Sequence, residues 1–231
     1  MARTNVGTRV IAGALYGLVI CYSLFVVYTA WIPVLVVGGV LAYLELTRLV
    51  RRAFDGAARV AALVLGGLYL LGGLAALAQL QFAWAGEISP VPPYFGRWAL
   101  LALAATWAAD IAAYAIGSRF GRRRIAPRLS PGKTLEGTIA GVVAAALVAV
   151  TLGAVYGLAP VGVAIVAVLA GPAALTGDLL ESALKRAAGA KDSGGLIPGH
   201  GGVLDRIDSL LLVAPAVYLG FVVARSGMMV R

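Results

Sequence analysis

The sequence predicts an all-α, polytopic membrane protein, and three observations support this prediction. Hydrophobic residues make up 61% of the 231-residue chain and charged residues 13%, whereas soluble domains have roughly 45–50% and 25%. The apolar residues form runs of roughly 20, the length that a helix needs to cross a bilayer. The 30 glycines suit helices that pack closely through small side chains. We therefore expect one membrane domain over residues 1–231, a helical bundle without a separate soluble part.

About seven transmembrane helices are predicted, one for each apolar run. They lie near residues 10–28, 31–49, 59–83, 97–118, 136–157, 160–180 and 203–223. Only Pro33 and the aromatic cluster at 28–31 divide the first two runs, so that boundary is the least sharply defined. The helices within residues 1–100 carry no recognisable motif, and we expect them to form a wall around lipid tails. The motifs considered below all lie within residues 101–231.

The basic residues orient the predicted helices. With the N-terminus in the cytoplasm, all but three of the 19 lysines and arginines fall on the cytoplasmic side, the exceptions being Arg97, Arg225 and Arg231. Cytoplasmic loops of membrane proteins carry such an excess. The net charge of +9 therefore indicates contact with anionic lipid head groups and nucleotide phosphates, and no nucleic-acid binding. We expect a multi-pass protein of the cytoplasmic (inner) membrane, with its polar motifs at the cytoplasmic face.

The densest polar segment joins the last two predicted helices. Four polar residues share one face at the end of the sixth helix: Asp178, Glu181, Ser182 and Lys185. Asp205 and Asp208, three residues apart, share a face at the start of the seventh helix. The glycine-rich turn at 194–202 lies between the two helices, so we expect a hairpin that brings Asp178 and Asp205 together.

This hairpin predicts a cation site. Carboxylate and hydroxyl oxygens of Asp178, Asp205 and Ser182 near one point, facing basic residues, suit Mg²⁺ that carries a nucleotide. The alternative is that Asp178 and Asp205 only form ion pairs with Lys185 and Arg206 that neutralise buried charge. Ion pairing would explain the individual charged residues. It does not explain why a serine and a glycine-rich turn accompany them in a fixed order.

A second polar cluster precedes the predicted fifth helix, in the segment Ser-Pro-Gly-Lys-Thr-Leu-Glu-Gly at 130–137. Its Gly-Lys-Thr run ends like a P-loop, but that motif needs a glycine at the position of Pro127 and a preceding strand. The P-loop interpretation therefore fails. Lys133 lies at a helix N-terminus, where it is placed to bind a phosphate. The alternative is an ordinary helix start that Thr134 caps.

Two acidic residues lie inside other predicted helices. Asp110 is about two turns from the end of the fourth helix, and an ionisable residue within a span is a functional candidate. Asp110, Tyr114 and Ser118 share a face, so we expect a polar path toward the site, with a structural hydrogen bond of Asp110 as the alternative. Glu45, near the end of the second helix, is predicted to pair with Arg48 and is assigned no further role.

The polar segment resembles the signature of the phosphatidate cytidylyltransferase (CDP-diacylglycerol synthase) family. It reads Ser-Ala-Leu-Lys-Arg at 182–186, Lys-Asp at 191–192 and His-Gly-Gly-Val-Leu-Asp-Arg-Ile-Asp at 200–208. The segment at 130–137 is similar to a second element of the same family. The resemblance runs from Asp110 to Ser209, and residues 101–231 are therefore expected to hold the catalytic helices.

The resemblance implies an Mg²⁺-dependent transfer of a cytidylyl group from CTP to phosphatidic acid, giving CDP-diacylglycerol and pyrophosphate. It implies a metal centre at Asp178, Ser182 and Asp205, and allows a second cation such as K⁺. The predicted catalytic residues are Asp178, Asp205, Lys185 and Lys133. The predicted substrate-binding residues are Ser182, Arg186, Lys191, Asp192, His200, Gly201, Gly202, Arg206, Asp208 and Asp110. The resemblance also suggests a homodimer.

His200 is the only histidine of the chain, but it is not predicted to act as a general base. The nucleophile is a lipid phosphate monoester with a second pKa of about 6–7, by analogy with protein phosphates, so it is largely dianionic at neutral pH. We expect His200 to shape the glycine turn or to donate a hydrogen bond to a phosphate.

Two other functions remain as alternatives. A related CTP-using lipid enzyme, either a CDP-archaeol synthase or a polyprenol kinase, would differ in the lipid or in the group transferred. A transporter of an anionic substrate would place its binding groups near the midplane and would often contain internal repeats. Here the charges lie at one face, and the sequence contains no visible repeat.

Overall fold

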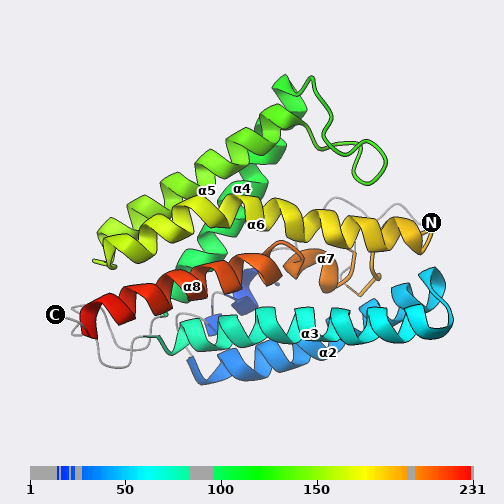
Figure 1. Cartoon of the computed structure of the whole chain (residues 1–231), viewed down its shortest axis with the longest axis horizontal. Helices are drawn as coiled ribbons and strands as arrows, with labels where there is room; N and C mark the ends of the chain where they lie inside the picture. Colours follow the sequence, from blue (N-terminus) through cyan, green and yellow to red (C-terminus); the bar gives the residue numbers. More distant parts are fainter. Residues whose placement is uncertain are drawn as a thin grey trace.

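The computed structural model describes residues 15, 17–20, 22–23, 28–83, 96–196 and 201–229, which form a bundle of long helices (Figure 1). After a short 3₁₀ turn, η1 (Tyr28–Ala30), the helices are α2 (Trp31–Ala53), α3 (Gly56–Gln81), α4 (Arg97–Phe120), α5 (Leu135–Val155), α6 (Pro160–Ala187), α7 (Leu204–Ile207) and α8 (Leu210–Met229). Among the described residues, 6 segments are long and apolar enough to cross a membrane, with α7 and most of α8 forming one of them. The predicted all-α, multi-pass fold is confirmed.

The helix predictions agree with the structure from residue 31 onward. The predicted helix at 10–28 falls largely outside the described residues. The helix predicted at 160–180 continues to Ala187, and Glu181 and Lys185 form an ion pair one turn apart in this added part, which favours the helix. The last predicted helix is divided near residues 208–209, where α7 ends and α8 begins.

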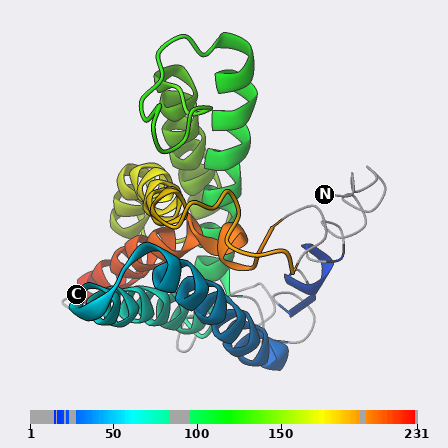
Figure 2. The same ribbon diagram turned by 90° about the vertical axis from the view of Figure 1, so that its right-hand side faces the viewer.

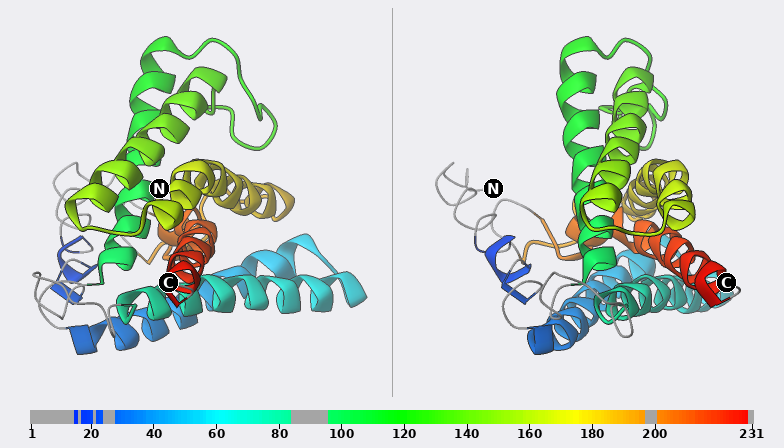
Figure 3. Two further views of the ribbon diagram at one scale, coloured as in Figure 1. Left: turned by 60° about the vertical axis from the view of Figure 1, so that its left-hand side comes forward. Right: turned by 90° about the vertical axis from the view of Figure 1, so that its left-hand side faces the viewer.

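Most helix contacts follow a series of neighbours, and α4 also contacts α8, α6 and α3. Helix α2 packs on α3, α3 on α8, α8 on α6, α6 on α5 and α5 on α4. In Figure 1 the α2–α3 pair lies below α6 and α8, the loop end of the α4–α5 hairpin lies above them, and α4 passes behind α6. Figures 2 and 3 show the loop end of this hairpin extending away from the other helices, while the start of α4 lies among them. The polar motifs of α5, α6 and α7 are therefore brought together by the α5–α6 and α6–α8 contacts.

Glycines allow two of these contacts to be close. A Cβ atom on Gly137 would lie 2.6 Å from the carbonyl oxygen of Ala113, so the start of α5 approaches the backbone of α4. A Cβ atom on Gly177 of α6 would collide with the carbonyl oxygen of Asp208. Small residues at helix interfaces permit such approaches, and both lie beside the polar motifs.

The loops and helix ends that carry the motifs lie at one end of the bundle. The α2–α3 turn, the α4–α5 loop and the end of α6 are all on the right in Figure 1. The last turns of α2, α4 and α6 contain Arg51 and Arg52, Arg119, and Lys185 and Arg186, respectively. Basic residues from separate parts of the sequence thus gather at this end, in agreement with the orientation that their distribution along the sequence predicts.

Candidate active site

A cavity of about 600 Å³ lies between the end of α4, the α4–α5 loop, α6 and α7. Eight of the residues predicted for the site line it: Asp110, Lys133, Asp178, Lys185, Asp192, Asp205, Arg206 and Asp208. Tyr114 and Ser118 line it as well, so the predicted polar face of α4 does point toward the site. The two separate motifs of the sequence therefore share one cavity.

The α4–α5 loop supplies Lys133. An isolated β-bridge between Arg124 and Thr134 closes the loop, and Glu136 accepts hydrogen bonds from two backbone N–H groups at its start. The Thr134 hydroxyl accepts a hydrogen bond from the backbone N–H of Gly137 at 3.2 Å, so Thr134 caps the helix as the alternative interpretation of this segment stated. Lys133 is thus presented by a closed loop directly before a capped helix.

The Lys133 ammonium pairs with Asp178 of α6. Its Nζ lies 2.6 Å from Asp178 Oδ2, and the two side chains are 20% and 31% exposed. The Ser182 hydroxyl, one turn further along α6, donates to Asp178 Oδ1 at 3.2 Å. This pair joins the two motifs across the cavity while leaving Asp178 accessible from it.

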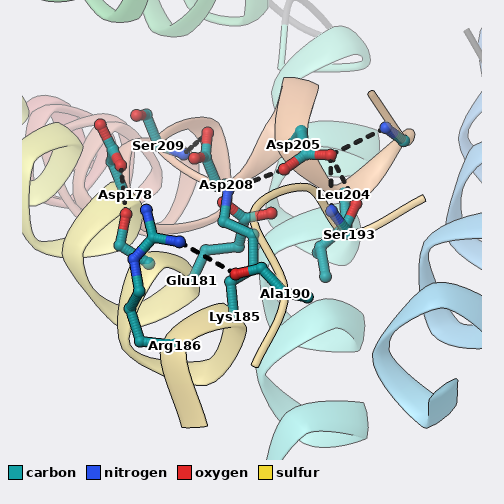
Figure 4. A network of polar contacts seen from close by, with 12 residues as sticks. Asp178, Glu181, Lys185, Arg186, Ala190, Ser193, Leu204, Asp205, Asp208 and Ser209 are labelled. Atoms are coloured by element: carbon teal, nitrogen blue, oxygen red, sulfur yellow. Dashed lines mark hydrogen bonds and ion pairs between the residues drawn. The ribbon is translucent and has the colours of Figure 1, made fainter. Parts of the chain in front are cut away.

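A second ion pair, at Lys185, is more deeply buried (Figure 4). Lys185 Nζ donates to Asp205 Oδ1 at 2.7 Å and also pairs with Glu181. Asp205 Oδ2 accepts three further hydrogen bonds, from the N–H of Ser193 at 2.9 Å, its hydroxyl at 2.8 Å and the N–H of Gly202 at 2.8 Å. The side chains of Lys185 and Asp205 are only 12% and 5% exposed. Both oxygens of Asp205 therefore have protein partners.

The ion-pair alternative of the sequence analysis is thus realised in part. Asp205 pairs with Lys185, but Asp178 pairs with Lys133 from the other motif. Lys133 was assigned to phosphate binding, and the sequence offered no signal for its pairing with Asp178, because the loop and α6 are far apart in the chain.

Two further carboxylates face the same cavity from α4 and α7. Asp110 lies close enough to Asp178 and Lys133 to interact with them electrostatically, and Asp208 interacts with both Asp178 and Asp110. The backbone N–H of Ser209 donates to Asp208 Oδ1 at 2.7 Å. Among the described residues, however, no group of three or more His, Cys, Asp or Glu side chains could hold a metal ion. A cation here would need oxygen ligands from a substrate or from water.

The remaining predicted residues lie beside the cavity. Arg186 donates to the carbonyl oxygens of Leu129 and Ala190, at 3.0 Å each, and so ties the α4–α5 loop to the end of α6. Lys191 is exposed and does not line the cavity. His200 lies outside the described residues.

The glycines predicted for the site shape the turn itself. Gly201 has φ = +82°, a conformation that favours glycine, and a Cβ atom there would lie 2.6 Å from Asp205 Oδ2. Gly202 supplies one of the backbone N–H groups bound by Asp205. These contacts explain why two glycines precede Asp205 so closely.

Glu45 of α2 has other partners than the one predicted from the sequence. The structure shows no ion pair between Glu45 and Arg48, which is exposed, so that prediction was wrong. Glu45 is buried and accepts hydrogen bonds from the Ser193 hydroxyl and from the N–H groups of Val203 and Leu204. These partners lie about 150 residues further along the chain, and local spacing carries no signal for them.

The fold and the site define a multi-pass membrane protein with a charged cavity at one end of its helices. Residues 92–224 match the cytidylyltransferase family, and the chain belongs to that family. The matched region contains α4 to α7 and most of α8, and therefore all of the cavity-lining residues. Helices α2 and α3 lie outside it.

Three relatives illustrate the similarity. The chain is 52% identical over 122 residues to a phosphatidate cytidylyltransferase of Synechocystis sp., a match that covers 52% of this chain and 41% of that protein. It is 45% identical over 130 residues to a phosphatidate cytidylyltransferase of Thermotoga maritima, covering 53% and 48% of the two chains. It is 44% identical over 122 residues to the uncharacterised protein YnbB of Escherichia coli, covering 52% and 40%. The matched part of the chain thus spans less than half the length of each relative.

Proposed function

We propose that this protein transfers the cytidylyl group of CTP to phosphatidic acid, giving CDP-diacylglycerol and pyrophosphate for phospholipid biosynthesis. Membership of the cytidylyltransferase family supports the proposal, as do the names of the Synechocystis and Thermotoga relatives. The observation that carries it is the meeting of the two motifs, where Lys133 and Asp178 pair at the edge of one charged cavity. That cavity is large enough to admit the phosphates of a nucleotide beside a lipid head group.

The proposed step is a direct displacement at phosphorus. A phosphate oxygen of phosphatidic acid attacks the α-phosphorus of CTP, and the bond from that phosphorus to the oxygen bridging the β-phosphate breaks. Pyrophosphate leaves with the electron pair of that bond. The attacking phosphate is already largely dianionic, with a second pKa of about 6–7, so no general base is needed. The protein contributes mainly position and electrostatic stabilisation.

Three cationic side chains of the cavity have roles in this step. Lys133, Lys185 and Arg206 line the cavity and would neutralise the charge of the triphosphate and of departing pyrophosphate. Lys133 is the most readily redirected of the ion-paired lysines, because its pair with Asp178 is partly exposed. Lys185 is held by two carboxylates and would act in place.

The residues present fit Mg²⁺ as a cofactor that arrives with the nucleotide. Mg²⁺ is usually held by one or two carboxylates together with substrate phosphates and water. Asp178 supplies the accessible carboxylate, with Ser182 beside it. Asp205, the second predicted ligand, would join only by giving up one of its present donors. When bound, the ion would offset phosphate charge in the transition state. A second cation such as K⁺ stays a prediction.

The site belongs, in this proposal, at the cytoplasmic face of the inner membrane. The positive-inside rule supports this placement, because the cavity lies at the end of the bundle where the basic helix ends gather. A water-soluble nucleotide and a membrane lipid can meet there. The predicted homodimer rests on the family resemblance alone.

A labelling experiment tests the proposal. Purified protein in detergent would be given phosphatidic acid, Mg²⁺ and CTP labelled with ³²P at the α-phosphate, and we expect label in the lipid phase with release of pyrophosphate. Chelation of Mg²⁺ should stop the transfer, and its return should restore it. Transfer of a γ-phosphate label instead would identify a lipid kinase, such as a polyprenol kinase. A preference for an archaeol phosphate would identify a CDP-archaeol synthase. No transfer to any lipid would contradict the proposal and favour an anion transporter.

A further inference from the structure

The buried carboxylate of Glu45 lies in α2, outside the residues that match the family. Glu45 is only 3% exposed. Its Oε1 accepts a hydrogen bond from the N–H of Val203 at 3.1 Å, and its Oε2 accepts one from the N–H of Leu204 at 2.9 Å. The Ser193 hydroxyl lies 3.1 Å from Oε2. These three partners, Ser193, Val203 and Leu204, all lie within the signature segment at 182–208.

A carboxylate at this depth is stable only if donors replace its lost hydration. The donors of Glu45 include the two backbone N–H groups at the start of α7, which have no partner within the helix because they lie in its first turn. Each side thus satisfies the other, and Glu45 fixes where α7 begins.

The same segment contains the donors that hold Asp205. Ser193 gives both its N–H and its hydroxyl to Asp205 Oδ2, and Gly202 gives its N–H. The single hydroxyl proton of Ser193 serves either Asp205 or Glu45 at any moment, because the oxygen lies 2.8 Å from one carboxylate and 3.1 Å from the other. The turn therefore lies between two carboxylates, Glu45 on the α2 side and Asp205 on the cavity side.

The glycines of the turn confirm how closely Glu45 approaches. A Cβ atom on Gly194 would lie 2.5 Å from Glu45 Oε1. A Cβ atom on Gly202 would collide with both carboxylate oxygens of Glu45 and with the Ser193 hydroxyl. A side chain at either position of the turn would therefore displace the Glu45 carboxylate.

We infer that Glu45 is a positioning residue for the active site, which holds the signature turn so that Asp205 and Lys185 keep their places in the cavity. Glu45 does not line the cavity, so it would act only through the turn. The inference assigns a function to α2, which has no motif of its own. Its consequence for turnover rests on the proposed function, whereas its consequence for the turn does not.

The test compares two substitutions of Glu45 with a matched acid-to-amide control. Glu45→Gln keeps one acceptor oxygen but places an NH₂ group against a backbone donor, and Glu45→Ala removes both oxygens. Asp55→Asn is the control, because Asp55 lies in the α2–α3 turn, its side chain is 95% exposed and its ion pair with Arg59 is at the surface. Hydrogen–deuterium exchange of peptides covering residues 201–209 and cytidylyl transfer from CTP are measured on each full-length protein.

We expect faster exchange in residues 201–209 for both Glu45 variants, greater for Glu45→Ala, with wild-type exchange in α4 and α5. The kcat for transfer should fall about 10–100-fold in Glu45→Gln, the range found when groups that orient a site are removed. The KM for CTP should change less than kcat, because Glu45 does not touch the cavity. Asp55→Asn should match the wild type in both measurements.

Two outcomes would overturn the inference: wild-type exchange at residues 201–209 in Glu45→Ala, or a kcat for Glu45→Gln equal to that of Asp55→Asn. If the wild type itself transfers no cytidylyl group, the proposed function fails, but the exchange measurement still decides the role of Glu45.

If Glu45→Ala does not fold, Ser193→Ala combined with Glu45→Gln replaces it. Strictly additive effects of these two substitutions on exchange would then count against coupling through the turn, and non-additive effects would support it.

Discussion

The two ion pairs that face the cavity differ in burial and in the number of their partners. Lys133 and Asp178 are 20% and 31% exposed, and Asp178 has one further partner, Ser182. Lys185 and Asp205 are 12% and 5% exposed, and Asp205 accepts three further hydrogen bonds. An exposed pair is weak and can exchange partners, whereas a buried carboxylate with all its donors is costly to disturb. The same chemistry thus leaves a carboxylate accessible from the cavity in one place and holds the turn in the other.

The two pairs also depend on different parts of the fold. The Lys133 side is formed by the α4–α5 loop, which the bridge at Arg124 closes locally. The Lys185 side is connected through the turn to Glu45 of α2. Substitutions should therefore separate into those that lower turnover alone and those that lower turnover and stability together.

The largest combined effect is expected from Asp205→Asn. The substitution removes an oxygen from a site that accepts four hydrogen bonds and leaves Lys185 with Glu181 as its ionic partner. Turnover should be abolished, and the free energy of unfolding should fall by about 1–3 kcal/mol because buried donors lose their acceptor. Thermal unfolding in detergent and the CTP transfer assay measure the two effects. Wild-type stability would show that this carboxylate does not support the turn.

Asp178→Asn should abolish turnover without the loss of stability. Its carboxylate is partly exposed and its ion pair with Lys133 is correspondingly weak, so the free energy of unfolding should change by less than about 1 kcal/mol. The same two assays apply. Near-normal turnover in this variant would contradict both the metal assignment and the contrast between the pairs.

Lys133→Met is expected to have a smaller effect on turnover. Removal of one positive charge that stabilises the phosphates should lower kcat/KM by about 10²–10³, the loss typical of a single electrostatic contact to a transition state. Arg128→Met is the control, because Arg128 is exposed on the same loop and does not line the cavity. Equal losses in the two variants would mean that the loop contributes general charge rather than a specific contact.

The smallest effect is expected from Tyr69→Phe. The Tyr69 hydroxyl of α3 donates to the carbonyl oxygen of Asp208 at 3.1 Å, a second contact from outside the matched region to the signature. Its loss should lower the free energy of unfolding by about 0.5–1.5 kcal/mol and should leave measurable turnover. Thermal unfolding of Tyr69→Phe, beside Tyr43→Phe at an exposed position of α2, measures this. A loss of turnover as complete as that of Asp178→Asn would place Tyr69 in the chemistry itself.

Much of the site could be predicted from the sequence because its information is local. The spacing of Asp178, Ser182 and Lys185 on one helix face, and of Asp205 and Asp208 on another, is enough to predict that they gather. Asp110 was found by its charge within an apolar run. Of these six residues, all except Ser182 line the cavity, and Ser182 contacts it through Asp178.

The sequence by itself determined the fold class, the positions of the helices from residue 31 onward and the motifs that line the cavity, because each follows from residues within a few turns of one another. Only the tertiary structure decided which charges pair. Lys133 binds Asp178, and Glu45 binds the turn instead of Arg48, because helix packing brings together groups that are far apart in the chain. A buried charge takes the donors that packing places beside it, and no local spacing in the sequence records which ones those are.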